Sequence, residues 1–344
     1  MKVGVLIPTF NREYFLAQAL GSILEQTFCD LEILVIDNAS SDGTSKFMTG
    51  ISDPKVRYIV NENNLGMIGS INKGIRLFTD DVTWCTILGD DDLLDIGYIA
   101  SMLDFVGAYA VKAIAHGHRK FIDSVGHRLR DAVQAPLVES SLEYISDRSA
   151  FKRETFLTGV FFSRKAFEKI GGYPKFTTGM ATDDAFIFAL SLQDNLYFNR
   201  QAVAFVRFHS EAESHRTVDA IKHLQALKEF KDYVELAARN ANKYSPGELE
   251  RLDRTLHKYI RHHNGALLLR SINALLDNDD KMSFVQLTEL YKIAENKDYA
   301  FLTCVKVYVV LLKIFDIFPG CNRMFRFIWQ TLAKIKHVFA IHRS

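Results

Sequence analysis

Three consecutive aspartates, Asp90, Asp91 and Asp92, follow the short apolar segment Val82–Leu88. Like charges held this close repel one another and raise one another's pKa unless a cation intervenes. Carboxylate oxygens suit Mg²⁺ or Mn²⁺, and Mg²⁺ usually takes one or two carboxylates and completes its shell with water and substrate phosphate. The triplet therefore indicates a divalent-cation site for a nucleotide diphosphate. The alternative is a solvated acidic turn that caps the next helix.

Polar residues also follow two earlier apolar segments. Pro8, Thr9 and Arg12 come after residues 3–7, and Asp37 and Asn38 come after residues 31–36. Asp37 and Asn38 offer an acceptor and an amide to a base or a ribose, as acids after the second strand do in nucleotide-binding folds. The alternative is an Asx-rich turn in which Ser41 or Asp42 caps the next helix.

Two further segments, Asn64-Leu65-Gly66 and Asn72-Lys73-Gly74, have two interpretations. In the first, Asn64-Leu65-Gly66 is a turn and Gly74 is a glycine that lets a helix pack closely. In the second, the helix that begins near Gly66 directs its free N–H groups at a phosphate. On the second interpretation Asn64, Gly66 and Asn72 belong to the donor site.

The elements that position these residues follow from the apolar pattern of residues 1–110. The short runs Val3–Ile7, Leu31–Ile36, Val56–Val60 and Val82–Leu88 predict buried strands, and apolar residues at helical spacing over 16–24 and 68–78 predict helices. This alternation predicts an α/β fold with a doubly wound parallel sheet, whose ligands lie beyond the carboxyl ends of the strands.

The rest of the chain is less regular. Strands at Phe156–Phe162 and Tyr197–Phe208, with helices near Arg164–Ile170 and Asp184–Gln193, predict an α+β completion of the sheet, and residues after Thr217 read as successive helices. We therefore expect a catalytic domain at 1–215, with a nucleotide-binding half at 1–110 and an acceptor-side half at 111–215. Residues 216–344 form a helical region.

Composition excludes several classes of protein. The 42 Lys and Arg balance 41 Asp and Glu, which argues against nucleic acid as a partner. The four cysteines form no CxxC pair, so a zinc site and a disulfide framework are not indicated, and the first residues lack the apolar run of a signal peptide. No GxxxxGK[ST], GxGxxG or GxSxG is present. We expect a cytoplasmic protein.

At this point the chain resembles the glycosyltransferase family 2 enzymes. The matching segments are VLIPTFNREYFLAQALGSILEQTF, ILVIDNASSDGT, NNLGMIGSINKG, LGDDDLLD, SRKAFEKIGGYP and ATDDAFIFAL, within roughly residues 2–210. The resemblance implies a GT-A fold, Rossmann-like with a mainly parallel sheet, here with a C-terminal all-helical extension. It also implies that Pro8, Thr9, Arg12, Asp37 and Asn38 line the nucleoside pocket, and that Asp90, Asp91 and Asp92 hold the metal and sugar nucleotide at a DXD-type position.

Two departures from the family pattern affect the donor site. A UDP-sugar is the donor that the resemblance favours, but Asp37-Asn38 stands where many members have two aspartates, and the missing second carboxylate leaves dTDP- and GDP-sugars open. The cluster reads Gly-Asp-Asp-Asp rather than Asp-X-Asp-Asp, and by register Asp91 is the main ligand of Mn²⁺ or Mg²⁺.

The resemblance also supplies a base. Asp184 matches the family's catalytic base by register and Asp183 its partner, although both acids equally complement the positive end of a helix. His209 falls where members place a histidine near the metal and diphosphate, and Arg207 adds charge to the same diphosphate. A lone histidine is also a common structural residue.

The C-terminal segment is basic and aromatic. Residues 299–344 contain seven Lys or Arg and one acid, among apolar faces that include Phe301, Tyr308 and Trp329. Such faces suit an interfacial helix on anionic lipid, which predicts peripheral attachment to the cytoplasmic face of the inner membrane and a lipid-linked acceptor. The alternative is a helical pair packed on the catalytic domain.

Together these features predict an inverting, metal-dependent glycosyltransferase that moves a sugar from a nucleotide donor to a hydroxyl of a glycan or lipid-linked acceptor, in O-antigen or related surface polysaccharide synthesis. The rivals are a nucleotidyltransferase and an inactive sugar-nucleotide-binding scaffold. Oligomeric state stays open, since the helices after Thr217 offer a face for a dimer.

Overall fold

The computed structural model describes residues 1–209 and 220–277, with side chains up to residue 264. The chain divides into two compact units, one of Met1–Val218 with Gln225–Leu256 and the other of Asp219–Leu224 with His257–Ser344. The predicted boundary between residues 215 and 216 lies outside the described residues. So do the basic C-terminal segment and every helix expected after residue 277.

The described strands form one sheet in the order β3-β2-β1-β4-β9-β6-β10-β5, with β7 beside β6 and β8 beside β10. The strands are β1 Lys2–Thr9, β2 Leu31–Asp37, β3 Val56–Val60, β4 Val82–Ile87, β5 Leu93–Leu94, β6 Ile114–Ile122, β7 Arg128–Asp131, β8 Val138–Glu139, β9 Val160–Ser163 and β10 Leu196–Arg207. The pairs β1–β2, β2–β3, β1–β4 and β6–β10 are parallel, and β9 joins β4 and β6 in antiparallel fashion. The predicted α/β class with a mainly parallel sheet is confirmed.

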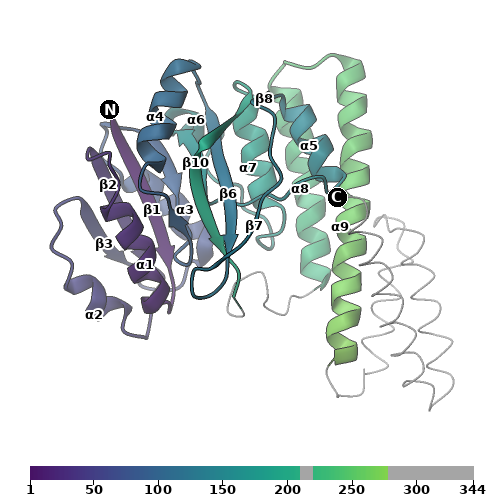
Figure 1. The fold of residues 1–344 in the computed structure, drawn as a ribbon. Coiled ribbons are helices and arrows are strands. Elements are labelled where there is room, and N and C mark those ends of the chain that lie inside the picture. The colour runs from purple at the N-terminus through teal and green to yellow at the C-terminus, as the bar shows by residue number, and fades with distance from the viewer. Residues whose placement is uncertain (210–219, 278–344) are drawn as a thin grey trace, which may run out of the picture. The chain divides into compact units, whose positions relative to one another are not determined.

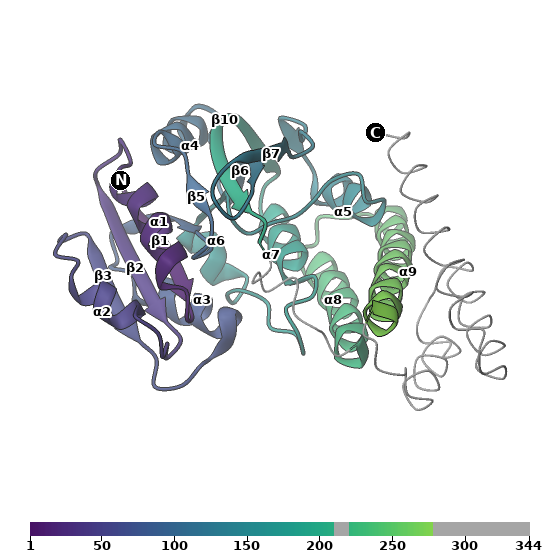
Figure 2. The same cartoon turned by 60° about the horizontal axis from the view of Figure 1, so that its bottom comes forward.

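Helices cover both faces of this sheet (Figures 1 and 2). The helices of the described residues are α1 Glu13–Leu24, α2 Thr44–Thr49, α3 Gly66–Leu77, α4 Tyr98–Ala108, α5 Ser141–Ser149, α6 Arg164–Lys169, α7 Thr182–Ser191, α8 Ala220–Asn240 and α9 Pro246–Asp277, and α8 and α9 are not among those that cover the sheet. Alternate residues of each strand point to opposite faces. Val3, Val5 and Ile7 of β1 pack in one cluster with the buried faces of α1 and α4. Leu6 of β1 and Ile36 of β2 lie under α3.

The elements between residues 111 and 209 depart in detail from the expected ones. The strand expected at Phe156–Phe162 begins only at Val160, because Gly159 adopts a φ of +83° and turns the preceding segment out of the sheet. Strands β6 and β7 and helices α4 and α5 carry no motif and were not expected from the sequence. Among the described helices, none is long and apolar enough to cross a membrane.

Glycine at position 74 brings α3 close to the sheet, as the helix-packing interpretation of Asn72-Lys73-Gly74 predicts. A Cβ at this position would lie 2.4 Å from Cδ1 of Leu6 and 3.0 Å from Cδ1 of Ile36. Both side chains are fully buried and have little room to move. The position therefore requires a residue without a side chain.

We expect Gly74→Ala to lower the free energy of unfolding by about 1–3 kcal/mol, the usual cost of overpacking a core. The matched control is Gly21→Ala in α1, where a Cβ would meet nothing within 4 Å. That change should raise stability by about 0.5–1 kcal/mol, since alanine is the better helix former. Urea denaturation measures both, and a Gly74→Ala protein as stable as the wild type would refute this account of the packing.

Candidate active site

The parallel strands β1, β2 and β4 end at one edge of the sheet and bring the predicted site residues together there. Thr9 lies opposite Asp37 in the β1–β2 register. The backbone N–H of Leu88 donates to the carbonyl of Leu6, which aligns the end of β4 with β1. The aspartate triplet therefore follows β4 at the edge where ligands of such sheets bind.

Asp90 is buried and is bound by the last residue of β1 and by a residue of the loop that follows it. Thr9 Oγ1 donates to its Oδ2 at 2.8 Å, and Arg12 Nη1 donates to its Oδ1 at 2.9 Å. Burial raises the pKa of Asp90 to about 6, although the Arg12 guanidinium acts in the opposite direction. The first loop of the chain thus holds the first aspartate of the triplet.

Asp92 has a different set of partners. Thr158 Oγ1 donates to its Oδ2 at 2.5 Å, and the backbone N–H of Arg207 donates to its Oδ1 at 2.8 Å. Burial raises the pKa of Asp92 well above that of a free aspartate. Both oxygens are engaged by the protein, so Asp92 joins the end of β4 to β10 and to the loop before β9.

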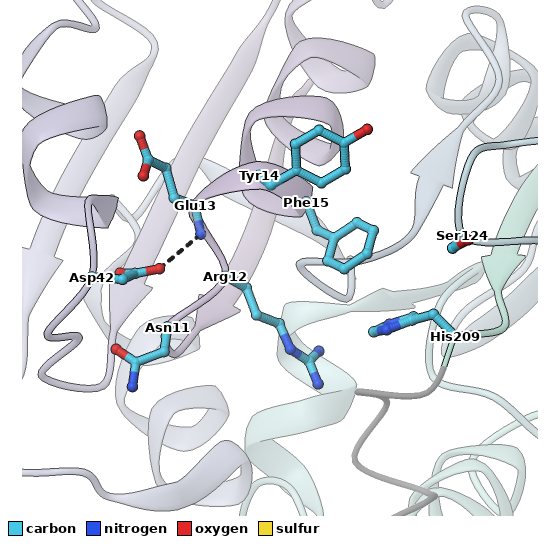
Figure 3. Close-up of a pocket in the computed structure, with 8 residues that line it drawn as sticks. All are labelled: Asn11, Arg12, Glu13, Tyr14, Phe15, Asp42, Ser124 and His209. Atoms are coloured by element: carbon cyan, nitrogen blue, oxygen red, sulfur yellow. Dashed lines mark hydrogen bonds between the residues drawn. The ribbon is translucent and has the colours of Figure 1, made fainter.

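Asp91 faces two cationic or titratable side chains. Its Oδ2 accepts from Arg12 Nη1 at 2.8 Å and lies 3.0 Å from Nε2 of His209. The His209 ring packs against Phe15, with 4.5 Å between ring centroids. Figure 3 shows Arg12, Phe15 and His209 facing one another along a cavity of about 450 Å³.

Asp91 and His209 carry the ligand types that Mn²⁺ or Mg²⁺ accepts, a carboxylate oxygen and an imidazole nitrogen. In the structure these two atoms are hydrogen-bonded to each other at 3.0 Å, and a cation bound by both would take the place of that bond. No group of three or more His, Cys, Asp or Glu gathers as a metal site in the described part of the chain. A cation held here by two protein ligands leaves positions for water and phosphate, as Mg²⁺ usually requires.

Arg207 lies beneath this cluster rather than open to a ligand. Its Nε donates to the carbonyl of Asp91 at 2.7 Å, and Nη1 donates to the carbonyl of Ser124 at 3.0 Å. Its Nη2 donates to Oε1 of Gln18 at 3.0 Å. A direct contact to a diphosphate stays a prediction, and in the structure the guanidinium ties together the segments around Asp91.

At the end of β2, Asp37 and Asn38 are both buried. The Asp37 carboxylate accepts from the backbone N–H of Ser40 at 2.8 Å and from the Tyr58 hydroxyl at 2.6 Å. Asn38 Oδ1 accepts from the Ser70 hydroxyl at 2.7 Å. The Asp37 carboxylate therefore has structural partners, and the Asn38 side chain faces α3. The expected cap by Ser41 or Asp42 is wrong, because the N-cap residue of α2 is Gly43, which has no side chain to cap that helix.

The predicted donor residues on α3 have structural partners. Asn64 Oδ1 accepts from the N–H of Gly66 at 2.8 Å, which occupies one of the free N–H groups at the start of α3. Asn72 Nδ2 donates to the carbonyl of Tyr173 at 2.9 Å, and its Oδ1 accepts from the N–H of Tyr173 at 2.8 Å. Asn72 therefore clamps the loop before α7, and its role in donor binding stays a prediction.

Asp183 and Asp184 begin α7, which the short turn at 192–195 connects to β10. Because α7 packs on β10, the reversal at this turn directs the first residues of α7 toward the carboxyl edge of the sheet. Successive residues of a helix point about 100° apart, so the two acids have different surroundings.

Asp184 is almost fully buried and held by four donors. Tyr144 Oη donates at 2.6 Å, and Thr155 Oγ1 donates at 2.8 Å. Arg148 donates through Nε at 2.8 Å and through Nη2 at 3.0 Å, one bond to each carboxylate oxygen. This is the arrangement of a structural ion pair, and the assignment of Asp184 as the base stays a prediction.

Asp183 is partly exposed and has fewer partners. Its Oδ1 accepts from the hydroxyl of Tyr173. Burial raises the pKa of Asp183 to about 6, against the lowering effect of the Tyr173 hydroxyl. A carboxylate that titrates near neutral pH and retains an accessible oxygen is suited to accept a proton.

Sequence reasoning missed the partners of these acids. Tyr144, Arg148, Thr155 and Thr158 belong to no motif, and the residues they bind lie 29 to 66 positions away. Only Tyr173 lay in a recognised segment, SRKAFEKIGGYP, and nothing in that segment indicates that its hydroxyl donates to Asp183.

Comparison with known proteins identifies the class. Residues 4–171 match the family model for glycosyl transferase family 2. S. aureus TarS in complex with UDP has a TM-score of 0.60 at 16% identity, covering 80% of each chain. The mannosyltransferase PcManGT from Pyrobaculum calidifontis, in complex with GDP-Man and Mn²⁺, has a TM-score of 0.51 at 17% identity, covering 92% of this chain and 87% of that one. The fold is the GT-A fold.

A curated relative agrees with this class. The GalNAc(5)-diNAcBac-PP-undecaprenol beta-1,3-glucosyltransferase of Campylobacter jejuni is 36% identical over 105 residues, which are 30% of this chain and 33% of that protein. The matches to the first curated relatives span about a third of their lengths. Residues 4–171 thus match glycosyltransferase family 2, and the resemblance seen in the motifs is confirmed for this part of the chain.

We expect Asp184→Ala to lower the free energy of unfolding by about 3 kcal/mol or more, because it leaves the Arg148 guanidinium without its buried carboxylate.

Asp183→Asn should behave differently. The folded-state pKa of about 6 lies above that of an unfolded aspartate, so ionised Asp183 costs stability as the pH rises through 6. At pH 8 the Asn variant should be at least as stable as the wild type. Denaturant titrations at pH 8 measure the free energy of unfolding of both variants. Equal losses of stability in Asp184→Ala and Asp183→Asn would contradict this prediction.

Proposed function

We propose that the domain transfers a sugar from a nucleoside diphosphate donor to an acceptor hydroxyl with inversion of the anomeric centre. The observation that carries the proposal is the approach of His209 Nε2 to Asp91 Oδ2 beside Arg12, at the carboxyl edge of a family 2 sheet. This cluster supplies cationic and metal-ligating groups to a leaving diphosphate. Asp183 supplies a base on the same side of the sheet.

In the proposed step the acceptor oxygen forms a bond to the anomeric carbon while the bond from that carbon to the diphosphate oxygen breaks. Asp183 takes the proton of the acceptor hydroxyl, and the Tyr173 hydroxyl holds its carboxylate in place. Arg12 contributes positive charge next to Asp91. Mn²⁺ or Mg²⁺ held by Asp91 and His209 would offset the negative charge that develops on the diphosphate.

The donor is a nucleotide sugar, for which a UDP-sugar is favoured and dTDP- or GDP-sugars are the alternatives. Support comes from the neighbours of the same fold, whose structures contain UDP, UDP-GlcNAc and GDP-Man. The acceptor is proposed to be a glycan or a lipid-linked glycan. The name of the Campylobacter relative contains such a lipid-linked acceptor.

Residues 216–344 are proposed as a helical region that attaches the protein to the cytoplasmic face of the inner membrane. The support is the excess of Lys and Arg over acids in residues 299–344, among aromatic residues. Residues 299–344 all lie outside the described residues. A packed helical pair that covers the catalytic domain is the alternative.

The direct test of the function is donor turnover. The full chain is incubated with Mn²⁺ or Mg²⁺, an acceptor extract and a panel of nucleotide sugars, and released nucleoside diphosphate is measured with and without chelator. We expect chelator-sensitive release from one donor. Release of pyrophosphate instead would indicate a nucleotidyltransferase, and donor binding without release would indicate an inactive scaffold.

The base can be tested by comparing neighbouring carboxylates. We expect Asp183→Asn to lower turnover by at least about 100-fold while donor binding persists. The pH profile of the wild type should fall on its acid side near pH 6, where Asp183 is protonated. Tyr173→Phe should move that acid limb to higher pH, because the hydroxyl bond that favours the carboxylate is lost. A folded Asp184→Asn protein that alone loses turnover would instead assign the base to Asp184.

The cation site can be tested without turnover. Asp91→Asn and His209→Ala should each weaken Mn²⁺ binding in the presence of nucleoside diphosphate by more than about tenfold, because each removes a proposed ligand. His127→Ala, at an exposed histidine in the β6–β7 turn, is the control and should bind Mn²⁺ like the wild type. Electron paramagnetic resonance of free Mn²⁺ gives the affinities. Unchanged binding in both site variants would remove this pair from the proposal.

A further inference from the structure

Helix α8 contacts the loop that leads to Asp183. This loop, residues 174–181, joins Tyr173 to the first turn of α7. The backbone N–H of Thr177 donates to Oε2 of Glu229 at 2.6 Å, and the Thr177 hydroxyl donates to Oε1 at 2.6 Å. The ring of Tyr233 packs edge to face against Phe176, with 5.9 Å between ring centroids. Residues four apart lie on the same face of a helix, so one face of α8 binds two consecutive residues of loop 174–181.

The two bonds between Thr177 and Glu229 are of a strong kind. Hydrogen bonds to an ionised carboxylate are roughly twice as strong as those between neutral groups. Although burial acts in the opposite direction, the bonds from Thr177 hold the pKa of Glu229 below its usual value. The Gln225 amide also donates to Oε1 of Glu229 at 3.2 Å. An ionised and oriented carboxylate therefore holds the middle of the loop.

The loop ends on a strained residue directly before α7. Ala181 adopts a φ of +61°, in the left-handed region, which costs a residue with a Cβ about 1–3 kcal/mol unless its surroundings hold it there. Short-range bonds connect Thr177 to this point. Thr178 Oγ1 accepts from the N–H of Met180 at 3.2 Å, and the Thr182 hydroxyl donates to the carbonyl of Gly179 at 2.7 Å. If Thr177 were released, the strain at Ala181 would favour a change in the loop.

The turn after α8 contacts the same region. Lys243 Nζ donates to the carbonyl of Asp194, in the turn after α7, at 3.0 Å. The Tyr244 hydroxyl shares a hydrogen bond with the hydroxyl of Ser141, at the start of α5. The C-terminal part of the chain thus contacts the loop before α7, the turn after it and the helix beside it. The family match ends at residue 171, before all of these elements.

We infer that Glu229 is a positioning residue of the transfer reaction. By holding Thr177, it keeps loop 174–181 in the conformation that presents Asp183 to the acceptor hydroxyl. Glu229 touches none of the reacting groups and acts through the loop alone. The inference rests on the proposed function and deepens it, because it makes α8 part of the machinery that places the base.

The first experiment is Glu229→Ala in the full chain. Turnover is the release of nucleoside diphosphate at saturating donor, with Mg²⁺ and the acceptor extract, per folded molecule as given by denaturant titration. We expect turnover to fall by about tenfold or more, because two charge-assisted bonds that favour the productive loop are lost. The dissociation constant of the nucleoside diphosphate should change less than about twofold, since its proposed ligands are Arg12, Asp91 and His209.

The matched control removes the same charge from another position of α8. Asp232 lies three residues beyond Glu229 and is exposed. Asp232→Ala should turn over and bind the nucleoside diphosphate like the wild type. A tenfold loss in this variant as well would show that the charge of α8, and not the contact with Thr177, is what matters.

Two further variants should recover turnover. In Glu229→Gln the amide oxygen can accept from the N–H of Thr177, and the amide nitrogen can donate to the Thr177 hydroxyl, so most of the turnover should remain. Glycine adopts a positive φ without strain, so adding Ala181→Gly to Glu229→Ala should raise turnover by at least about threefold. No recovery with Ala181→Gly would remove the strain from this account.

Hydrogen exchange tests the loop without turnover. In mass spectrometry, the amides of residues 175–183 should exchange about tenfold faster in Glu229→Ala than in the wild type, because the loop opens more often. Asp232→Ala should exchange like the wild type. Unchanged exchange in Glu229→Ala would show that Glu229 does not hold the loop.

The remaining outcomes separate the inference from the proposed function. Faster exchange with unchanged turnover would show that the held loop does not serve the reaction. A parallel loss of turnover and of nucleoside diphosphate binding would place the effect of Glu229 outside the loop. Either result overturns the inference and leaves the proposed function standing. If the wild type released nucleoside diphosphate from no donor, the proposed function would fail, and the inference about the reaction would fail with it.

Discussion

Mutual repulsion among the three aspartates after β4 is the constraint on which the arrangement of the site depends. Arg12 bridges the first two carboxylates, with Thr9 as the second partner of Asp90 and His209 beside Asp91. Asp92 is bound elsewhere, by Thr158 and the backbone of Arg207. The triplet therefore joins both halves of the sheet at one edge. Only Asp91 has its carboxylate directed at groups that suit a diphosphate and its cation.

The same separation of neighbouring acids occurs on α7. Adjacent helical residues point in different directions, so Asp184 turns toward Arg148 and Tyr144 while Asp183 meets the hydroxyl of Tyr173. The buried pair at Asp184 fixes the start of the helix through α5. This leaves Asp183 half-buried with a raised pKa, a combination that suits proton transfer near neutral pH. Of these two neighbouring aspartates, Asp184 therefore forms a structural ion pair, and Asp183 has surroundings that suit proton transfer.

The sequence predicted the first half of the fold well because its signals are local. Val3–Ile7 and Val56–Val60 are short apolar strands with polar residues at their ends, and the structure places the strands there with errors of one or two residues. The partners of the site residues were not predictable in this way. Arg148 reaches Asp184 from 36 positions away, and Asn72 binds Tyr173 across 101 positions. Such contacts depend on how β6, β9 and β10 complete the sheet, which no local pattern encodes. The contact between His209 and Asp91 is different, because both residues follow strands of the predicted pattern and those strands end at the same edge of the sheet.

Helix α3 connects these features, because consecutive residues on it serve different ends of the site. Lys73 donates to Asn61, whose amide nitrogen donates to Asn38 at the end of β2. Asn72 binds the backbone of Tyr173, whose hydroxyl donates to Asp183. The next residue after Lys73, Gly74, lets the helix sit directly on Leu6 of β1. The close packing at Gly74 therefore fixes the distance of both polar contacts from the sheet. If α3 moved outward by the width of a methyl group, the Lys73 and Asn72 side chains would shift with it. The geometry of the proposed site therefore depends on the core packing under α3.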